Sequence, residues 1–332
     1  MRILMRADAG AARGTGHVMR CLTLAESLLL RGHEVVLAGR IGGVPWLQRH
    51  LDALDIPVHD VPTDSFDPGL LEQFEPNRVI VDSYWIEAAA ISLINRSVPV
   101  LAIVDHDTRG IDASWFLDQN LGAEDRAWPE SVRSRMLAGS KFALVRSAIA
   151  RHRRVAGWQL PARPSVLAFM GGTDPFRYMT DVARSIASRL PDLDFIAVTT
   201  SEQVDAVNAA TREMSRSRVL EPTQDLPALL GAADVVVSAA GTSAWDVLTM
   251  ARPTVLVGVV DNQSDSLEIA IERGLALGID AAKHEVSDVG DMLQRLLQDE
   301  RLRERLVRAA SAEFDGLGAQ RVSEQLEESP SG

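Results

Sequence analysis

The sequence has 332 residues, of which 46% are hydrophobic and 24% charged, and its formal net charge is −12 at pH 7. This length accommodates two domains of ordinary size, and the negative charge argues against a nucleic-acid partner. No apolar stretch approaches the roughly 20 residues that a membrane-spanning helix needs, and the N-terminus reaches acidic and glycine residues too early for a signal peptide. We therefore expect a cytoplasmic protein without membrane insertion, and a monomer is the default oligomeric state.

Cysteine usage restricts the chemistry further. Cys21 is the only cysteine, which excludes an internal disulfide and a thiolate metal cage. It stands beside Leu22 and Ala25 at helical spacing, so we predict that it is a small buried apolar side chain. We expect neither a metal ion nor a cofactor.

The first part of the chain alternates strand and helix patterns, which predicts parallel α/β layers. Residues 2–6 are predicted to form a strand, and apolar residues from 18 to 29 recur at three- and four-residue steps, as in an amphipathic helix. Gly32 takes the position that follows a helix end, and residues 34–38 are predicted to form the next strand. Residues 78–83 and 99–107 are short apolar runs that end in acidic residues, as buried parallel strands do.

The same pattern restarts after residues 143–164, which we interpret as containing the linker. Strand patterns then reappear in "SVLAFMGGTDP", "DFIAVTT", "ADVVVSAAGTSAWDVLTM" and "RPTVLVGVVDNQ". Each half opens with a strand and a glycine-bearing loop. We therefore predict two Rossmann-like doubly wound domains that face each other across a cleft, residues 1–150 and 151–328.

Three glycine loops follow predicted strands: "RADAGAARGTGH" (6–17), "GGTDP" (171–175) and "SAAGTSAWD" (238–246). The first departs from the dinucleotide fingerprint, since the third glycine would fall on Met19, and no loop carries the Gly-Lys-Ser/Thr of a Walker motif. Any one of them can be a simple strand-to-helix turn. Because all three precede predicted helices, whose N-termini favour anions, together they favour a ligand that bears phosphate and sugar.

Longer motifs carry a resemblance to a known family. "GTGHVMRCLTLAESLLLRGHEV" (14–35) is followed in order by "VDSYWI" (81–86), "VDHD" (104–107), "FALVR" (142–146), "MGGTDP" (170–175), "SAAGTSAWDVLTMARPTVLVG" (238–258), "DNQ" (261–263) and "FDGLGAQRV" (314–322). This series resembles the GT-B group that includes the MurG-type glycosyltransferases. It looks most similar to the PseG-like UDP-sugar hydrolases, which act on UDP-2,4-diacetamido-2,4,6-trideoxy-β-L-altropyranose in pseudaminic acid biosynthesis.

The resemblance implies a GT-B fold in which the second domain holds the nucleotide and the first holds the reacting sugar. It also implies that His17 is the catalytic base and that Asp246, where the family often has glutamate, contacts the ribose. Ser83 stands where the family often has histidine, which leaves the sugar open. The candidate substrate-binding residues are Asp8, Gly14, Gly16, Asp82, Tyr84, Asp105, Gly171, Gly172, Thr173, Gly241, Thr242, Ser243, Asp246, Asn262 and Gln263.

The residues themselves also favour His17 as a base. It follows a glycine turn at the start of a predicted helix, and an unperturbed imidazole, with a pKa near 6.5, is partly neutral at cytoplasmic pH. The hypothesis is that water, deprotonated by His17, attacks the anomeric carbon, so that UDP leaves with inversion and without a metal ion. Loop amides at 171–173 and 241–243 would stabilise the developing charge. Asp8, Asp82, Asp105 and Asp107 are all candidates to orient the imidazole, and His106 is a candidate for a supporting role.

Three alternatives remain open from the sequence. An inverting glycosyltransferase would use the same base with a small hydroxyl acceptor in place of water. A binding protein of the same fold would hold the nucleotide sugar without turning it over. A non-hydrolysing epimerase would need a further set of carboxylates, which the sequence does not make evident.

Overall fold

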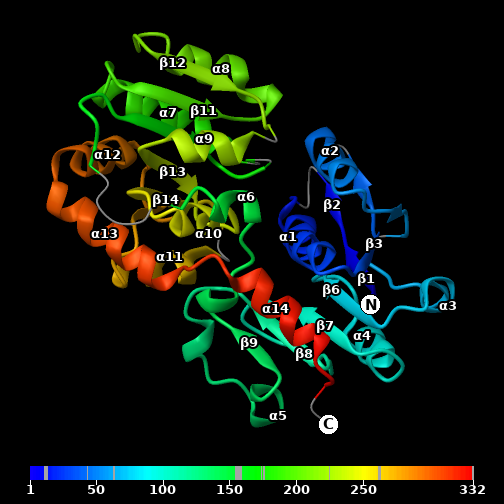
Figure 1. Cartoon of the computed structure of the whole chain (residues 1–332). Coiled ribbons are helices and arrows are strands. Elements are labelled where there is room, and N and C mark those ends of the chain that lie inside the picture. Colours follow the sequence, from blue (N-terminus) through cyan, green and yellow to red (C-terminus); the bar gives the residue numbers. More distant parts are fainter. Residues whose placement is uncertain are drawn as a thin grey trace. The chain divides into compact units, whose positions relative to one another are not determined.

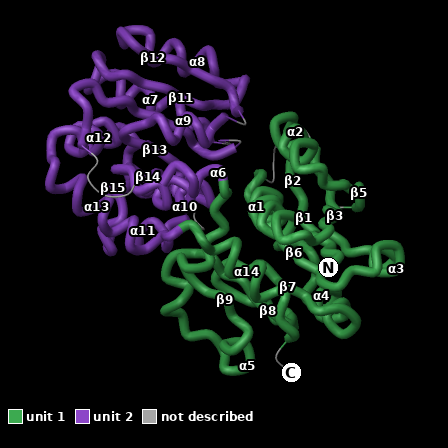
Figure 2. Tube along the Cα trace, in the orientation of Figure 1, with its two compact units in different colours: residues 1–147, 316–332 green, residues 148–315 purple. Residues whose placement is uncertain are grey.

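The computed structural model describes residues 1–10, 14–42, 44–62, 64–153, 159–172, 174, 176–223, 225–260 and 263–330. The chain divides into two compact units, one formed by Met1–Ser147 with Gly316–Gly332 and the other by Ala148–Asp315 (Figure 2). The predicted second domain runs to residue 328. The chain beyond Asp315 instead belongs to the compact unit formed by the N-terminal residues.

The first unit is built on a parallel sheet with the strand order β5-β3-β1-β6-β7-β8-β9 (Figure 1). A separate two-stranded sheet in the same unit pairs β2 with β4 in parallel. The strands are β1 (Arg2–Ala7), β2 (Ala9–Gly10), β3 (Glu34–Ala38), β4 (Ile41–Gly42), β5 (Val58–His59), β6 (Arg78–Asp82), β7 (Val100–Ile103), β8 (Trp115–Asp118) and β9 (Met136–Ala138). The helices are α1 (Gly16–Leu30), α2 (Pro45–Ala53), α3 (Gly69–Phe74), α4 (Ala88–Asn95), α5 (Glu130–Arg133) and α14 (Gly318–Glu327).

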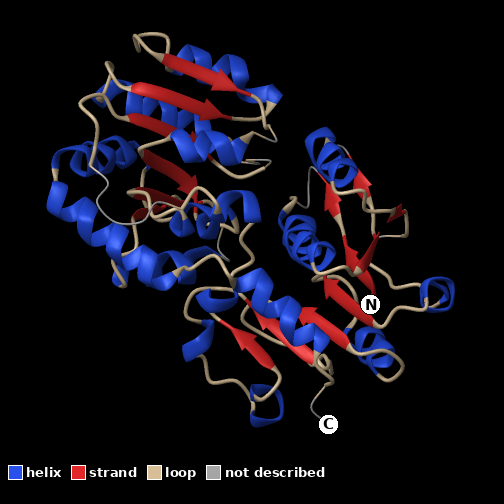
Figure 3. Cartoon of the chain, in the orientation of Figure 1, coloured by secondary structure: helices blue, strands red, loops and turns tan. Residues whose placement is uncertain are grey.

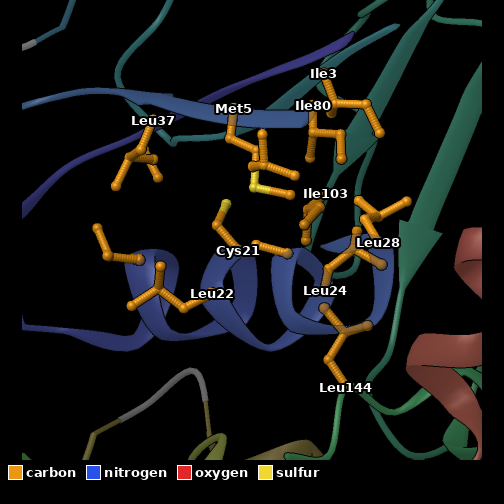
Figure 4. Packing of buried hydrophobic residues seen from close by; sticks show 14 of the residues in the cluster. Ile3, Met5, Cys21, Leu22, Leu24, Leu28, Leu37, Ile80, Ile103 and Leu144 are labelled. Carbon is orange, nitrogen blue, oxygen red and sulfur yellow. The ribbon is translucent and has the colours of Figure 1, made fainter. Parts of the chain in front are cut away.

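Successive side chains of each strand point to opposite faces of this sheet, and helices cover both faces, so each face is buried in a core of its own. Ile3 and Met5 of β1 pack with α1, α2 and α14 in one core, whereas Leu4 packs with α3, α4 and α5 in another. Figure 4 shows the first core, in which Cys21 of α1 lies among apolar side chains below the strands. Cys21 is fully buried, as predicted.

Helix α14 closes the first core although it comes last in the chain. Its buried residues Ala319, Val322 and Leu326 join the cluster around α1. At Gly318 a Cβ would lie 2.2 Å from the carbonyl oxygen of Ala143, so only glycine allows this approach. The C-terminal chain therefore returns to the first unit because an apolar helix face and a close backbone contact are completed there.

The second unit repeats the design on a parallel sheet with the order β12-β11-β10-β13-β14-β15. Strands and helices alternate along the chain in it, as in the first unit (Figure 3). Its strands are β10 (Ser165–Phe169), β11 (Asp194–Val198), β12 (Ser217–Leu220), β13 (Val235–Ala239), β14 (Thr254–Gly258) and β15 (Leu277–Asp280). Its helices are α7 (Tyr178–Arg189), α8 (Val204–Ala210), α9 (Leu226–Ala232), α10 (Ser243–Thr249), α11 (Ser264–Glu272), α12 (Val289–Gln298) and α13 (Glu300–Glu313), and α6 (Ser147–Ala150) lies where the chain passes between the units.

The strand and helix predictions agree closely with the structure. The strands predicted at 2–6 and 34–38 are β1 and β3, the helix predicted from 18 to 29 is the centre of α1, and Gly32 has the left-handed φ of +79° that follows a helix end. Every recorded pairing in the two large sheets is parallel. In the part of the chain that the structure describes, every helix is too short or too polar to cross a membrane.

Candidate active site

His17 lies at the carboxyl edge of the first sheet, in the first turn of α1. The preceding loop is closed by two backbone hydrogen bonds between Gly10 and Gly14, of 3.2 and 2.9 Å. Gly14 has a φ of +78°, a conformation that favours glycine, and Gly16 begins the helix. The glycines of this loop thus set the path by which the chain enters α1 and place His17 at the edge where parallel sheets collect their ligands.

The imidazole of His17 is held by Asp82, the last residue of β6. The Nδ1 atom lies 2.6 Å from Oδ1 of Asp82, whose side chain is 1% exposed. Nδ1 also lies 3.1 Å from Nη2 of Arg20, but that nitrogen donates to the same Asp82 oxygen at the shorter distance of 2.7 Å. A carboxylate only accepts hydrogen bonds, so we infer from the 2.6 Å contact that the proton is on Nδ1. The Nε2 atom then carries the lone pair, which is the arrangement of an imidazole ready to accept a proton from a substrate or water.

Arg20, one helical turn after His17, forms ion pairs with two carboxylates at the same time. Its Nε and Nη2 atoms donate to Asp82 at 2.8 and 2.7 Å, and its Nη1 atom donates to Asp105 at 2.8 and 3.0 Å. Burial alone would lower the pKa of Arg20, but the charges of Asp105 and Asp82 raise it well above its ordinary value. The guanidinium is therefore a permanent positive charge inside the site.

Asp105 follows β7 and is the second anchor of this network. It accepts hydrogen bonds from the Tyr84 hydroxyl and, at 2.6 Å, from Nδ2 of Asn120. Burial alone would raise the pKa of Asp105, but the Arg20 charge and these hydrogen bonds hold it well below its ordinary value. Burial and the neighbouring Asp105 charge raise the pKa of Tyr84, so its hydroxyl stays protonated and donates.

Two aromatic rings border the imidazole. The ring of Tyr84 meets that of His17 edge to face with centroids 4.7 Å apart, and Trp85 does so at 5.8 Å. Tyr84 is 42% and Trp85 39% exposed, whereas His17 is 8% exposed. The imidazole thus sits at the base of a partly exposed aromatic surface, which is a common setting for recognition of a ligand with one apolar and one polar side.

Of the four carboxylates left open as orienting groups, Asp82 is the one that contacts His17. Asp8 is buried and pairs with Arg6 at 2.8 Å, and it accepts a hydrogen bond from the Arg40 amide. Asp107 accepts from the amide of Arg109 in its own turn. Asp8, a predicted substrate ligand, therefore already makes polar contacts within the first unit, and these contacts link the end of β1 to the chain beyond β3.

His106 lies in the loop after β7, beside Asp105. It has a left-handed φ of +68°, its amide donates to Asp118 at 2.8 Å, and its Nδ1 atom is 2.7 Å from Nη2 of Arg126. Because a guanidinium only donates, Nδ1 accepts and the ring is held with its proton on Nε2. His106 supports the loop that positions Asp105.

In the second unit, Asp174 follows the second glycine loop and lies at the N-terminal end of α7. Its carboxylate accepts from the amides of Tyr178 and Met179 at 3.0 and 2.9 Å, and from Nε2 of Gln203 at 3.1 Å. Gly171, with a φ of +79°, makes the turn before it. The first amides of α7, expected to be free for an anion, are therefore taken by a carboxylate of the chain itself.

The third glycine loop is in contact with Gln263. A Cβ at Gly241 would lie 2.9 Å from Nε2 of Gln263, and Oε1 of Gln263 accepts from the Val259 amide at 3.0 Å. Thr242 and Ser243 begin α10, and Asp246 is buried in its first turn. Gly172 follows Gly171 in the second loop, while Thr173 and Asn262 lie outside the described residues.

His17, Asp82, Tyr84 and Asp105 are predicted site residues, and the structure brings all four together. Arg20, Trp85 and Asn120 were not predicted as members of the site. Arg20 had a usable signal, because it stands three residues after His17 and therefore on the same side of the helix. Asn120 had none, since it follows β8 and only the sheet order brings it to Asp105. Among the described residues, no three His, Cys, Asp or Glu side chains are grouped to hold a metal ion.

Comparisons with known proteins bear on the fold. No protein-family model matches the sequence. The chain is 20% identical over 300 residues to the spore coat polysaccharide biosynthesis protein SpsG of Bacillus subtilis strain 168, which covers 84% of each chain. It is similar to the crystal structure of Acinetobacter baumannii MurG, with a TM-score of 0.68, 16% identity and coverage of 98% of this chain and 99% of that one. It is also similar to a UDP-GlcNAc 2-epimerase from Neisseria meningitidis bound to UDP-GlcNAc, with a TM-score of 0.69, 12% identity and coverage of 98% and 99%.

The chain has the GT-B fold. The structural likenesses extend over nearly its whole length, and the two parallel α/β sheets are those of MurG and of glycosyltransferases such as the spinosyn forosaminyltransferase SpnP. The predicted fold class is confirmed.

Proposed function

We propose that the protein is a nucleotide-sugar hydrolase that releases UDP from a UDP-linked amino or deoxy sugar. The observation that carries this proposal is the buried contact of 2.6 Å between Nδ1 of His17 and Asp82, because it leaves Nε2 as a proton acceptor. The order of motifs that resembles the PseG-like hydrolases supports the choice of substrate class. The distant likeness to SpsG, whose name places it in polysaccharide biosynthesis, agrees with such a role.

In the proposed reaction, Nε2 of His17 takes a proton from water as the water oxygen attacks the anomeric carbon. The bond between that carbon and the diphosphate oxygen breaks, UDP leaves with the bonding electrons, and the sugar is released with inverted configuration. His17 becomes an imidazolium in this step. Arg20, Asp82 and Asp105 together carry one net negative charge (+1 −1 −1), which stabilises the imidazolium as it forms.

We assign recognition of UDP to the second unit. Gly241, Thr242 and Ser243 supply backbone amides at the start of α10, and Gln263 contacts this turn. Asp246 is the proposed ribose ligand. Tyr84 and Trp85, half-exposed beside His17, are proposed to contact the sugar.

The test is release of UDP from a panel of UDP-sugars, including the diacetamido trideoxy-altrose compound, with no acceptor added. We expect stoichiometric UDP and a sugar whose first-formed anomer, followed by NMR, is inverted. His17→Asn should lower the turnover rate by about 10²- to 10⁴-fold, which is the typical contribution of a general base. UDP affinity should stay within about threefold, because UDP recognition is assigned to the second unit. The control is His33→Asn, since His33 precedes β3 at the opposite edge of the same sheet. Turnover retained in the His17 variant would overturn the proposal.

An inverting glycosyltransferase is the second candidate. The structural likeness to MurG and to glycosyltransferases favours it, and the same base would then deprotonate a small hydroxyl acceptor. UDP release that depends on an added acceptor and is absent in water alone would establish this function in place of the hydrolase.

A further inference from the structure

The fork of Arg20 joins two branches of the candidate site that are far apart in the sequence. One side of the guanidinium binds Asp82, which binds His17. The other side binds Asp105, which binds the Tyr84 hydroxyl. The proposed base and the proposed sugar contact are thereby connected through one planar cation.

We propose that Arg20 is a positioning residue that holds His17 in a single tautomer and fixes Tyr84 beside it. This inference rests on the proposed function for its kinetic consequences, although its structural consequence can be measured without a substrate. Arg20 acts through Asp82 and Asp105 rather than on the reacting atoms.

The geometry requires an arginine. Three nitrogen atoms, Nε, Nη1 and Nη2, donate four hydrogen bonds of 2.7 to 3.0 Å to Asp82 and Asp105. A lysine presents one compact ammonium and is unable to span two carboxylates in a plane. Without Arg20 the two carboxylates would lie in a buried site with no cation between them, so both would shift or take up protons.

Arg20 also determines which nitrogen of His17 carries the proton. Its Nη2 atom and Nδ1 of His17 lie 2.7 and 2.6 Å from the same oxygen, Oδ1 of Asp82. The two nitrogen atoms are 3.1 Å apart, and as two donors to one oxygen they do not hydrogen-bond each other. As long as Arg20 keeps Asp82 ionised and in place, that oxygen accepts a hydrogen bond from Nδ1–H, and Nε2 stays unprotonated. If Asp82 turned or became protonated, the imidazole would be free to move its proton to Nε2 and would lose its function as a base.

The experiment uses the full chain with ¹⁵N-labelled histidine. In the wild-type protein we expect the His17 signals of the Nδ1–H tautomer and a downfield proton that exchanges slowly with water. In Arg20→Lys we expect mixed tautomers and loss of that proton signal. Asp105→Asn, which loosens the guanidinium from its other side, should weaken the same signal and provides the test if Arg20→Lys does not fold.

The kinetic test is a double-mutant comparison of UDP release. Arg20→Lys should lower kcat about 100-fold, the size of effect expected when a catalytic group is misplaced, and it should raise KM through Tyr84. Added to His17→Asn, the Arg20 change should lower kcat no further, because residues that act as a unit are not additive. Arg252→Lys is the control, since Arg252 is 1% exposed in the second unit and Arg20 5% exposed in the first. It should lower stability without altering kcat or the His17 signal.

Two results would overturn the inference. One is an unchanged His17 tautomer in folded Arg20→Lys, and the other is a loss of kcat that multiplies with that of His17→Asn. The failure of the proposed function would look different, because His17→Asn would then retain turnover or no UDP-sugar would be cleaved, while the NMR result on Arg20 would still stand.

Discussion

Replacing Asp82 with asparagine removes a charge from the site and changes little else in shape. In the wild-type protein the carboxylate lies 2.6 Å from Nδ1 of His17 and is almost completely buried. An asparagine oxygen can still accept a hydrogen bond from Nδ1, but it is neutral and therefore does not stabilise the positive charge of an imidazolium. We therefore expect Asp82→Asn to bind UDP as the wild type does and to lose turnover.

The magnitude follows from the distance and the burial. Two unit charges about 4 Å apart at an effective dielectric constant near 20 interact by about 4 kcal/mol. Each 1.36 kcal/mol corresponds to a factor of ten in rate, so complete loss of the interaction would lower kcat about 10³-fold. Arg20 keeps only Asp105 as its anion, and its positive charge gives the imidazolium no compensation, so we expect kcat to fall about 10³-fold.

The assay is acceptor-free release of UDP, with thermal denaturation to show that the variant is folded. Asp107→Asn is the matched control, because Asp107 follows the neighbouring strand and its carboxylate accepts a hydrogen bond from the Arg109 amide of its own turn. It should keep kcat within about twofold. A folded Asp82→Asn protein whose kcat stays within about fivefold of the wild type would refute the reasoning.

Three further predictions concern stability and reactivity. Burial raises the pKa of the Cys21 thiol, so a thiol reagent should label the native protein very slowly and the urea-unfolded protein at once; rapid native labelling would contradict this. The lowered folded-state pKa of Asp105 stabilises the fold above its unfolded pKa of about 3.9, and this stability is lost as the pH falls below that value; Asp105→Asn should flatten the acid side of a plot of unfolding free energy against pH. Gly318→Ala places a methyl group 2.2 Å from the Ala143 oxygen, so we expect the free energy of unfolding in urea to fall by about 1–3 kcal/mol, and an unchanged urea midpoint would disprove the close contact.

Much of the fold could be predicted from local patterns. The predicted strand at 34–38 and the helix around Cys21 agree with β3 and α1, because periodicity directly reports which side chains are buried. The return of α14 to the first unit was outside the reach of such patterns. An amphipathic helix shows in its sequence that one face needs covering, but not which core covers it, and here Gly318 and its neighbours fit against α1 and residue 143.

The candidate site, like the fold, could be predicted from the sequence only in part. The sequence by itself determined that His17 follows a glycine turn at a helix start and that acidic residues, Asp82 and Asp105, lie at or just after the ends of buried strands. Only the tertiary structure decided that Asp82, rather than Asp8 or Asp107, holds the imidazole, and that Asp174 occupies the start of α7. The physical reason is that hydrogen bonds depend on distances of a few tenths of an ångström between residues from different strands, and those distances are set by sheet order and packing, which no local pattern records.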